Sequence, residues 1–408
     1  MAVFLMESIV PEKKAGFPGI SRTVILLGFV SLLTDISSES IYPLIPLFLT
    51  GVLHAPVSAI GLIEGIAESV ASIVRIFSGW LSDRIGDRKW LTTAGYALSV
   101  LSKPLLSFSS GWHQVLGIRF MDRLGKGIRG APRDALIADV TPPGKRGIAF
   151  GFHNAMDTTG AVLGPLIAFW LLKSVGLSFR EIFLLAAIPG AIGVLILIFF
   201  VREKKKSANE REASLPSIRI GSFEGNFRMF LLITAVFSIG NSSDAFLILK
   251  AKQNGISTAN ILLVVVLFNS IQALLATPAG AVSDRLGRRN VILLGFLVFA
   301  AVYMGFGITS SPVITVILFA FYGVYSALTY GVQKAFASDL ISANMRGTGL
   351  GAYNMVTGIA LLPASLIAGL LWDKVNPSAP FVYGAAMALV AAFILAFSFR
   401  GDVIYSGR

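Results

Sequence analysis

The sequence has no cysteine, few charged residues and only three histidines. Without cysteine, the 408-residue chain forms neither a disulfide nor a thiolate metal site, and its three histidines lie too far apart in sequence to predict a metal centre. Charged residues make up 14% of the chain and hydrophobic residues 55%, whereas soluble domains carry roughly 25% charged residues. A soluble protein of this composition would expose one large apolar surface. The composition therefore excludes a soluble enzyme and a nucleic-acid-binding module, although the net charge is +12.

Long apolar segments recur along the whole chain. Twelve of them have the length that crosses a bilayer, about 17–25 residues. We expect each segment to form a transmembrane helix, which makes the protein a multi-pass integral membrane protein in contact with the lipid bilayer. The segments lie near residues 23–50, 57–81, 90–109, 113–138, 147–172, 181–201, 227–249, 257–281, 290–308, 312–338, 347–372 and 380–399.

The basic residues are distributed unevenly between the two sides of these predicted spans. With the N-terminus inside, 21 of the 34 Lys and Arg fall in cytoplasmic segments, five in external loops and eight within the spans. This positive-inside bias predicts that both termini are cytoplasmic, and we expect the cytoplasmic (inner) membrane as the location. The first 22 residues lack the layout of a signal peptide, because no long apolar core follows their basic residues.

The two halves of the chain repeat one another at an offset of about 200 residues. The segment Gly79–Lys89 (GWLSDRIGDRK) returns as Gly280–Asn290 (GAVSDRLGRRN). Each half holds six predicted spans, an even number, so both halves insert in the same direction, with a site between them near the midplane. The expected organisation is a cytoplasmic tail (1–22), a six-helix half (23–201), a cytoplasmic linker (202–226), a second six-helix half (227–400) and a cytoplasmic tail (401–408).

With these motifs the sequence resembles the major facilitator superfamily, whose loop motif reads G-x-x-x-D-[RK]-x-G-x-[RK]-[RK]. The first copy comprises Gly79, Asp83, Arg84, Gly86, Arg88 and Lys89, and the second Gly280, Asp284, Arg285, Gly287, Arg288 and Arg289. The resemblance covers the full chain and implies the all-α major facilitator fold, with twelve transmembrane helices as two six-helix repeats around a central cavity. We expect both loops to act in gating. The aspartate would bond the next helix's N-terminus or an arginine between the halves, with Arg146 and Arg346 as candidate partners.

The fifth predicted span carries a second motif, formed by Gly160, Gly164 and Pro165. Glycines four residues apart share one helix face and let a neighbouring helix approach closely, and the proline permits a bend. The pattern resembles a motif of the drug or metabolite:proton antiporter branch of the family. Close packing without any role in transport direction explains the same residues.

The fourth predicted span carries a stripe of basic and acidic residues between Arg119 and Asp134. At 100° per residue the stripe covers an arc of about 140°, and charges inside a bilayer face the protein interior or a water-filled cavity. The resemblance implies a functional arginine at Arg119, whereas Arg123 stands where the family pattern has glycine. The substrate or cavity candidates are Arg119, Asp122, Arg123 and Lys126, together with Asp244, Tyr325, Tyr330 and Asn354 of the second half.

Acidic residues in neighbouring spans complement this stripe. Asp35 and Glu39 lie one turn apart in the first span, Glu64 and Glu68 one turn apart in the second, and Asp157 lies in the fifth. Carboxylates held one turn apart in an apolar medium repel each other, which favours reversible protonation. We expect Asp35 and Glu39 to couple transport to protons, with the other three as further candidates. A static network that only neutralises the stripe is the alternative.

These features predict a secondary active transporter that works by alternating access and exports a small organic molecule by proton antiport. Proton-coupled import of an organic anion is the alternative, and a transport-dead sensor or scaffold on the same fold is a third interpretation. The sequence contains no HExxH, GxxxxGK[ST] or GxSxG motif, so we expect neither an enzyme nor a cofactor or metal. The expected partners are a small-molecule substrate and protons, without nucleic acid, and we expect a monomer.

Overall fold

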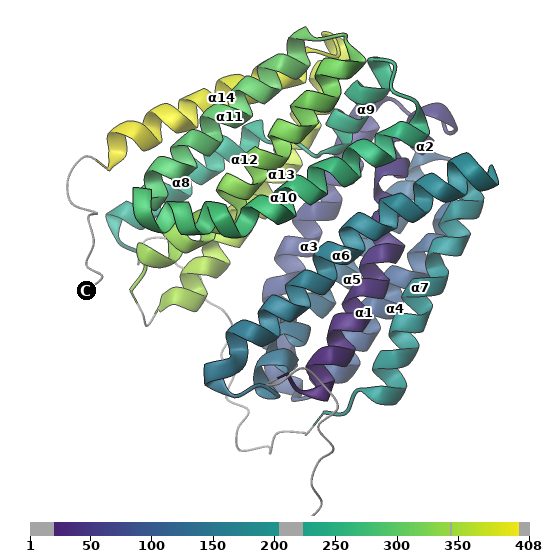
Figure 1. Cartoon of the computed structure of the whole chain (residues 1–408), viewed down its shortest axis with the longest axis vertical. Helices are drawn as coiled ribbons and strands as arrows, with labels where there is room; N and C mark the ends of the chain where they lie inside the picture. The colour runs from purple at the N-terminus through teal and green to yellow at the C-terminus, as the bar shows by residue number, and fades with distance from the viewer. Residues whose placement is uncertain (1–19, 204–222, 343–344, 400–408) are drawn as a thin grey trace, which may run out of the picture.

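The computed structural model describes residues 20–203, 223–342 and 345–399, and every regular element within these ranges is a helix (Figure 1). The N-terminal half comprises α1 (Arg22–Glu39), η1 (Tyr42–Leu44), α2 (Ile45–Gly51), α3 (Val57–Ile85), α4 (Arg88–Ser107), α5 (Trp112–Asp139), η2 (Pro143–Lys145), α6 (Arg146–Trp170), η3 (Leu171–Val175) and α7 (Phe179–Phe200). The C-terminal half comprises α8 (Gly225–Gly240), α9 (Ala245–Gln253), α10 (Thr258–Leu286), α11 (Arg288–Ile308), α12 (Pro312–Asp339), α13 (Arg346–Lys374) and α14 (Ala379–Ser398). Most of the predicted N-terminal tail, most of the predicted linker and the whole predicted C-terminal tail lie outside the described residues.

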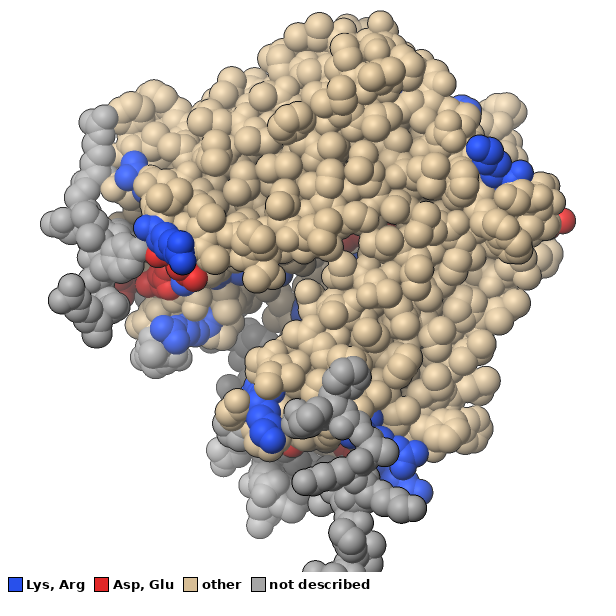
Figure 2. Space-filling model, in the orientation of Figure 1, with Lys and Arg blue, Asp and Glu red and all other residues tan. Residues whose placement is uncertain are grey.

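All twelve predicted spans coincide with helices. Ten of them are long and apolar enough to cross a membrane. The other two are α4 and α5, which hold Lys103 and the charged stripe respectively. Large apolar side chains such as Phe199, Ile308 and Phe393 are exposed on the outside, and Figure 2 shows a broad uncharged surface with charged side chains gathered toward the ends. The prediction of a multi-pass membrane protein is confirmed.

The first span of each half is interrupted at the corresponding place. Pro43 and Pro46 lie in and just after η1, where their missing amide hydrogens and fixed φ prevent one continuous helix. In the C-terminal half, α8 and α9 are separated without a proline. There the amide of Ser243 donates to Ser365 Oγ (3.2 Å) rather than to its own helix. The sequence predicted continuous helices over 23–50 and 227–249, and both predictions were wrong at the breaks.

Gly86 and Gly287, the second glycines of the two loop motifs, follow the second long helix of each half directly. Their φ angles are 69° and 87°, in the left-handed region that glycine adopts without steric cost. The next helix starts within two residues of each, so the motif glycine makes a tight reversal possible. The end of the molecule that holds Gly86 and Gly287 is called the motif end below.

The two halves meet along α3 and α13, and along α6 and α10. Small residues permit the closest approach: a Cβ added to Gly61 would overlap with the Ser365 carbonyl oxygen, and one added to Gly369 would lie 2.7 Å from Ser58 Cα. Between α10 and α6, Asn269 Nδ2 donates to the Ala161 carbonyl oxygen (2.9 Å). The interface therefore depends on backbone proximity more than on interlocked long side chains.

The halves are joined at the end opposite the motif end and separate toward the motif end. Figure 1 shows them converging beside α2 and α9, and Figure 2 shows the surface hollowed between them, with charged side chains visible inside. At the joined end, the Asp373 carboxylate of α13 accepts from the amides of Val57 (3.2 Å) and Ser58 (2.8 Å) at the start of α3. Pro56, the N-cap residue of α3, offers no side-chain acceptor, so a residue of the other half caps this helix.

We expect Asp373→Ala to loosen the joined end, because two helix-terminal amides lose a charged acceptor, a loss of about 0.5–2 kcal/mol. The chain has no natural cysteine, so a single Ser365→Cys substitution, at a fully buried position of α13, reports opening through its rate of reaction with a maleimide. The rate should rise several-fold in the Asp373→Ala background. Asp373→Asn keeps an oxygen acceptor and should give a smaller rise, while equal rates in all backgrounds would contradict the capping role.

Candidate functional site

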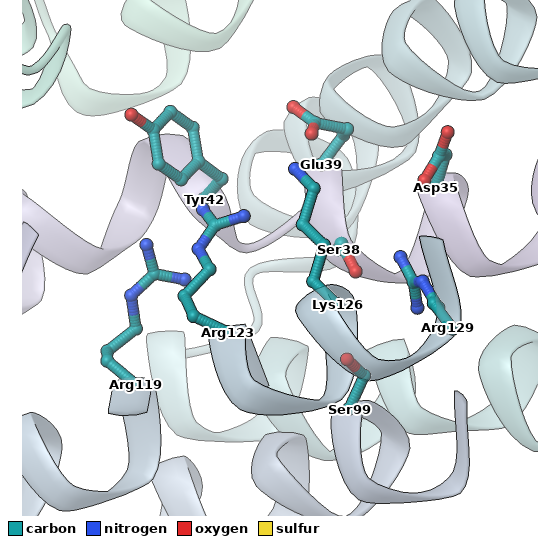
Figure 3. A pocket seen from close by; sticks show the side chains of 9 residues that line it. All are labelled: Asp35, Ser38, Glu39, Tyr42, Ser99, Arg119, Arg123, Lys126 and Arg129. Carbon is teal, nitrogen blue, oxygen red and sulfur yellow. The ribbon is translucent and has the colours of Figure 1, made fainter. Parts of the chain in front are cut away.

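A polar pocket lies within the N-terminal half, between α1, η1, α4 and α5 (Figure 3). It gathers five of the predicted site residues, and four others that were not among the site candidates. The predicted ones are Asp35, Glu39, Arg119, Arg123 and Lys126, and the others are Ser38, Tyr42, Ser99 and Arg129. Side chains nearly a hundred residues apart in sequence thus face one small space.

The carboxylates of α1 reach this pocket because α6 packs unusually close behind them. A Cβ added to Gly160 would lie 2.7 Å from Asp35 Cβ, and one added to Gly164 would lie 3.0 Å from Glu39 Cβ. Any larger residue at either glycine would push α6 away from α1. The glycine–proline motif therefore sets the position of both predicted proton-coupling residues.

Two arginines of α5 form ion pairs with the acidic residues of α3. Arg119 donates three hydrogen bonds to the Glu64 carboxylate at 2.8–3.1 Å and another to Asp122 at 3.2 Å. Arg123 Nη2 lies 3.0 Å from Glu68 Oε1. Arg119 and Glu64 are both almost completely buried, so each neutralises a charge that would otherwise be very unfavourable there. Glu64 and Glu68 are engaged as structural partners in this state.

Four charged groups of the pocket have no such partner. Lys126 and Arg129 form no ion pair with another described residue, and Asp35 and Glu39 form neither an ion pair nor a hydrogen bond with one. Arg129 lies over the ring of Tyr96 (4.3 Å from guanidinium carbon to ring centroid), and its buried Nη1 lacks a hydrogen-bond partner. Two cations and two carboxylates are therefore available to a ligand or to protons.

The remaining predicted residues lie outside this pocket. Asp157 faces Arg133 (4.0 Å) and His153 (3.5 Å). In the C-terminal half, Tyr322 donates to Asp244 (2.7 Å), Asn241 donates to Tyr325 (3.1 Å) and Lys334 lies 4.1 Å from the Tyr330 ring centroid. None of the four C-terminal candidates lines the pocket: Asp244, Tyr325, Tyr330 and the exposed Asn354.

Sequence reasoning missed Lys103, a residue of α4 that is almost completely buried. Its ammonium group contacts Asp122 (3.5 Å) and Ser38 (3.2 Å) at the back of the pocket wall. The available signal was a single lysine among the apolar residues of the third predicted span, because a charge at that depth requires a partner.

At the motif end, each loop motif ties together helices of its own half. Arg88 bonds Asp83 (2.6 Å) and also Asp139. In the C-terminal half, Arg288 bonds Asp339 (2.7 Å) and Asp284 (3.5 Å). The same three helix ends are therefore linked in both halves.

These contacts correct the predicted partners of the motif aspartates. Each motif aspartate bonds the side chain of the first residue of the next helix in its own half, Arg88 for Asp83 and Arg288 for Asp284. Arg146 and Arg346 form no ion pair with another described residue. The first amides of α4 donate instead to Glu203, from Arg88 (3.1 Å) and Lys89 (2.7 Å). The arginine that follows the motif glycine is nearer to the aspartate than the predicted partners, which explains the difference.

The family model of the Major Facilitator Superfamily matches residues 27–249 and 229–407. The chain belongs to the Major Facilitator Superfamily. Membership makes it a membrane transporter rather than an enzyme, as predicted, and the two matched segments confirm the repeated fold.

Relatives and solved structures agree with this assignment. An uncharacterised MFS-type transporter of Methanocaldococcus jannaschii is 37% identical, over 93% of this chain and 95% of its own length. The cis,cis-muconate transport protein of Acinetobacter baylyi is 26% identical (75% and 77% covered), and the multidrug resistance protein MdtG of Citrobacter koseri is 24% identical (79% and 83%). The crystal structure of the nucleoside transporter NupG has a TM-score of 0.78 at 14% identity, with 93% and 100% covered.

We expect Glu64→Gln to destabilise this major facilitator protein by about 3–5 kcal/mol, because a buried guanidinium loses its carboxylate partner. Thermal unfolding in detergent should show a clearly lower melting temperature. Glu181→Gln is the matched control. Glu181 is an exposed helix-cap residue, so its substitution should lower the free energy of unfolding much less. Equal melting temperatures for the two variants would contradict the structural role of the Arg119–Glu64 pair.

Proposed function

We propose that this protein is a proton-coupled secondary transporter that carries a small organic anion by alternating access. The observation that carries the proposal is the pair of cations, Lys126 and Arg129, that face two carboxylates, Asp35 and Glu39, with no direct ion pair among the four. An anion entering the pocket is attracted by the cations and repelled by ionised carboxylates. It therefore binds best when the carboxylates are protonated.

This linkage determines the sign of coupling. If protons strengthen the binding of an anion, the anion strengthens the binding of protons by the same factor, and the two move in the same direction. A cationic substrate would instead compete with protons for Asp35 and Glu39, and the two would be exchanged. The charge of the substrate therefore determines whether substrate and protons move in the same or in opposite directions. The similarity to a cis,cis-muconate transport protein supports an anionic substrate.

Export of a small organic molecule by proton antiport is the second candidate. Its support is the motif of Gly160, Gly164 and Pro165, which packs against the two carboxylates, and the similarity to a multidrug resistance protein. In this case Asp35 and Glu39 would accept either protons or the substrate, in alternation.

We also propose that the motif end faces the cytoplasm of the inner membrane, as the positive-inside bias indicates. The hollow between the halves then opens inward. The ion pairs of Arg88 and Arg288 would keep the helix ends of each half together while the halves rock, which is the gating role proposed for both motifs. Because the pocket and the hollow lie within one chain, a monomer is sufficient for transport.

The charge and coupling of the substrate are tested in proteoliposomes with three isosteric probes: anionic benzoate, neutral benzamide and cationic benzamidine. With the outside acidic, we expect benzoate and cis,cis-muconate to accumulate inside beyond the level reached in protein-free liposomes, which measure the passive entry of the neutral acids. The sign of coupling does not depend on the orientation of the inserted protein. Accumulation driven by an acidic interior would favour antiport, and flux no greater than in protein-free liposomes for every probe would favour a sensor or scaffold.

We expect Asp35→Asn combined with Glu39→Gln to abolish the protein-dependent accumulation driven by the pH gradient, while protein-dependent downhill flux of benzoate continues. The reason is that the remaining pocket binds the anion at any pH. Glu224→Gln, which removes one carboxylate at an exposed residue of the motif end, is the control and should remain coupled. Persistent coupling in the double variant would move the proton site to Asp157, Glu64 or Glu68.

We expect Lys126→Gln and Arg129→Gln each to raise the KM for benzoate by about tenfold, the effect of losing one bond to a charged group, about 1.5 kcal/mol. Lys252→Gln, on an exposed residue at the joined end, should leave the KM unchanged. A lower maximal rate with an unchanged KM in the pocket variants would contradict anion binding by these two cations.

A further inference from the structure

Lys103 is the most completely buried cation near the pocket, with 1% of its surface exposed. It comes from α4, one of the helices that line the pocket, and its side chain reaches α1 and α5. Its ammonium nitrogen lies 2.7 Å from the Ser99 carbonyl oxygen, 3.2 Å from Ser38 Oγ and 3.5 Å from Asp122 Oδ1. Its three hydrogens thus have three acceptors, and none is left for a ligand.

The bond to Ser38 occupies one of the two lone pairs of that hydroxyl and turns its hydrogen away from Lys103. A lysine ammonium donates hydrogen bonds and cannot accept one, so Ser38 Oγ must accept from Lys103. The hydrogen of the Ser38 hydroxyl is then directed elsewhere, and no described residue accepts it. Without Lys103, the hydroxyl hydrogen would have no preferred direction, and a donor bond to a ligand would be less well oriented.

Ser38 lies between the two predicted proton-coupling residues on the pocket face of α1. It lines the pocket itself, and in Figure 3 its oxygen projects between the side chains of Lys126 and Arg129. A hydrogen-bond donor that lines the same pocket as two unpaired cations complements a carboxylate or another oxyanion, and it would be of little use to a cationic ligand.

We propose that Lys103 is a positioning residue: it holds the Ser38 hydroxyl as a hydrogen-bond donor to an anionic group of the substrate, bound between Lys126 and Arg129. This inference rests on the proposed anion transport and names the group that completes the anion subsite. It assigns Lys103 a role in specificity although the lysine itself does not touch the substrate.

The test is a double-mutant cycle on the full-length protein in lipid nanodiscs, with the dissociation constants of benzoate and benzamide measured by calorimetry. We expect Ser38→Ala and Lys103→Met each to weaken benzoate binding about tenfold or more, the loss expected for one bond to a charged group. The double variant should be about as weak as either single variant, because Lys103 acts through Ser38. Benzamide, which lacks the charge, should be affected far less.

Ser37→Ala is the matched control. Ser37 is the neighbouring residue of α1, is fully buried and lies outside the pocket, so its loss should leave benzoate binding unchanged. Ser38→Thr keeps the hydroxyl and should restore most of the affinity lost in Ser38→Ala. Comparing Ser38→Ala with Ser38→Thr tests the role of the Ser38 hydroxyl as a donor even if Lys103→Met fails to fold.

Three outcomes would overturn the inference. Additive losses from Ser38→Ala and Lys103→Met, parallel losses for benzoate and benzamide, or unchanged benzoate binding in Ser38→Ala would each mean that Lys103 has only a structural role. Each of these leaves anion transport itself standing. Failure of the unmodified protein to bind either benzoate or cis,cis-muconate would instead overturn the proposed function, and the anion subsite with it.

Discussion

The arrangement of helices in the N-terminal half is determined by the need to bury the positive side chains of α5. An isolated charge in an apolar medium costs several kcal/mol even after relaxation, so each cation requires a countercharge or water. Asp122 provides the countercharge to three cations at once, because its carboxylate lies within 4 Å of Lys103, Arg119 and Arg123. Glu64 and Glu68 complete it from α3. The two neighbouring helices are therefore held to α5 electrostatically as well as by packing.

Glycines on α5 make this arrangement geometrically possible. A Cβ added to Gly125 would lie 2.5 Å from the Gly95 carbonyl oxygen on α4, and one added to Gly127 would lie 2.8 Å from Val74 Cβ on α3. The glycines and the basic residues that alternate in this helix thus serve one arrangement. The glycines bring α3 and α4 close enough for short acidic side chains, and for Lys103, to reach the basic ones.

The C-terminal half builds the same fold without buried ion pairs of this kind among its described residues. Its core is aromatic: Phe237 stacks on Phe296 with centroids 4.1 Å apart, and Phe299 stacks on Tyr303 at 3.9 Å. A six-helix repeat of this family therefore needs no charged interior to be stable. The charges of the N-terminal half are retained at an energetic cost, which argues that they serve a ligand.

The fold could be predicted from the sequence. The spans follow from apolar composition, the repeat from the offset of about 200 residues, and the loop motifs from short segments of the chain. The sequence also predicted site residues that the fold does bring together, Asp35, Glu39, Arg119, Arg123 and Lys126, because charged side chains in apolar helices face the interior or a cavity rather than lipid. It did not separate the engaged acids, Glu64 and Glu68, from the unpaired ones, because that distinction depends on which helix faces are in contact. The break between α8 and α9 was also missed, since no proline marks it and the decisive bond comes from Ser365, more than a hundred residues away.

One requirement follows from the location of the pocket. Its lining belongs entirely to the N-terminal half, yet a ligand shifts a conformational equilibrium only if it interacts differently with the two states. A group of the C-terminal half that met the substrate in only one state would supply this difference. The joined end offers small residues and backbone contacts along α3 and α13, which discriminate poorly between charges. At the open end, α12 carries Lys334 over the ring of the exposed Tyr330. If the halves closed at this end, Lys334 would approach Lys126 and Arg129 from the opposite side of the hollow. These three cations would repel one another in the empty protein. An anion bound at Lys126 and Arg129 would instead attract Lys334 and favour the closed state.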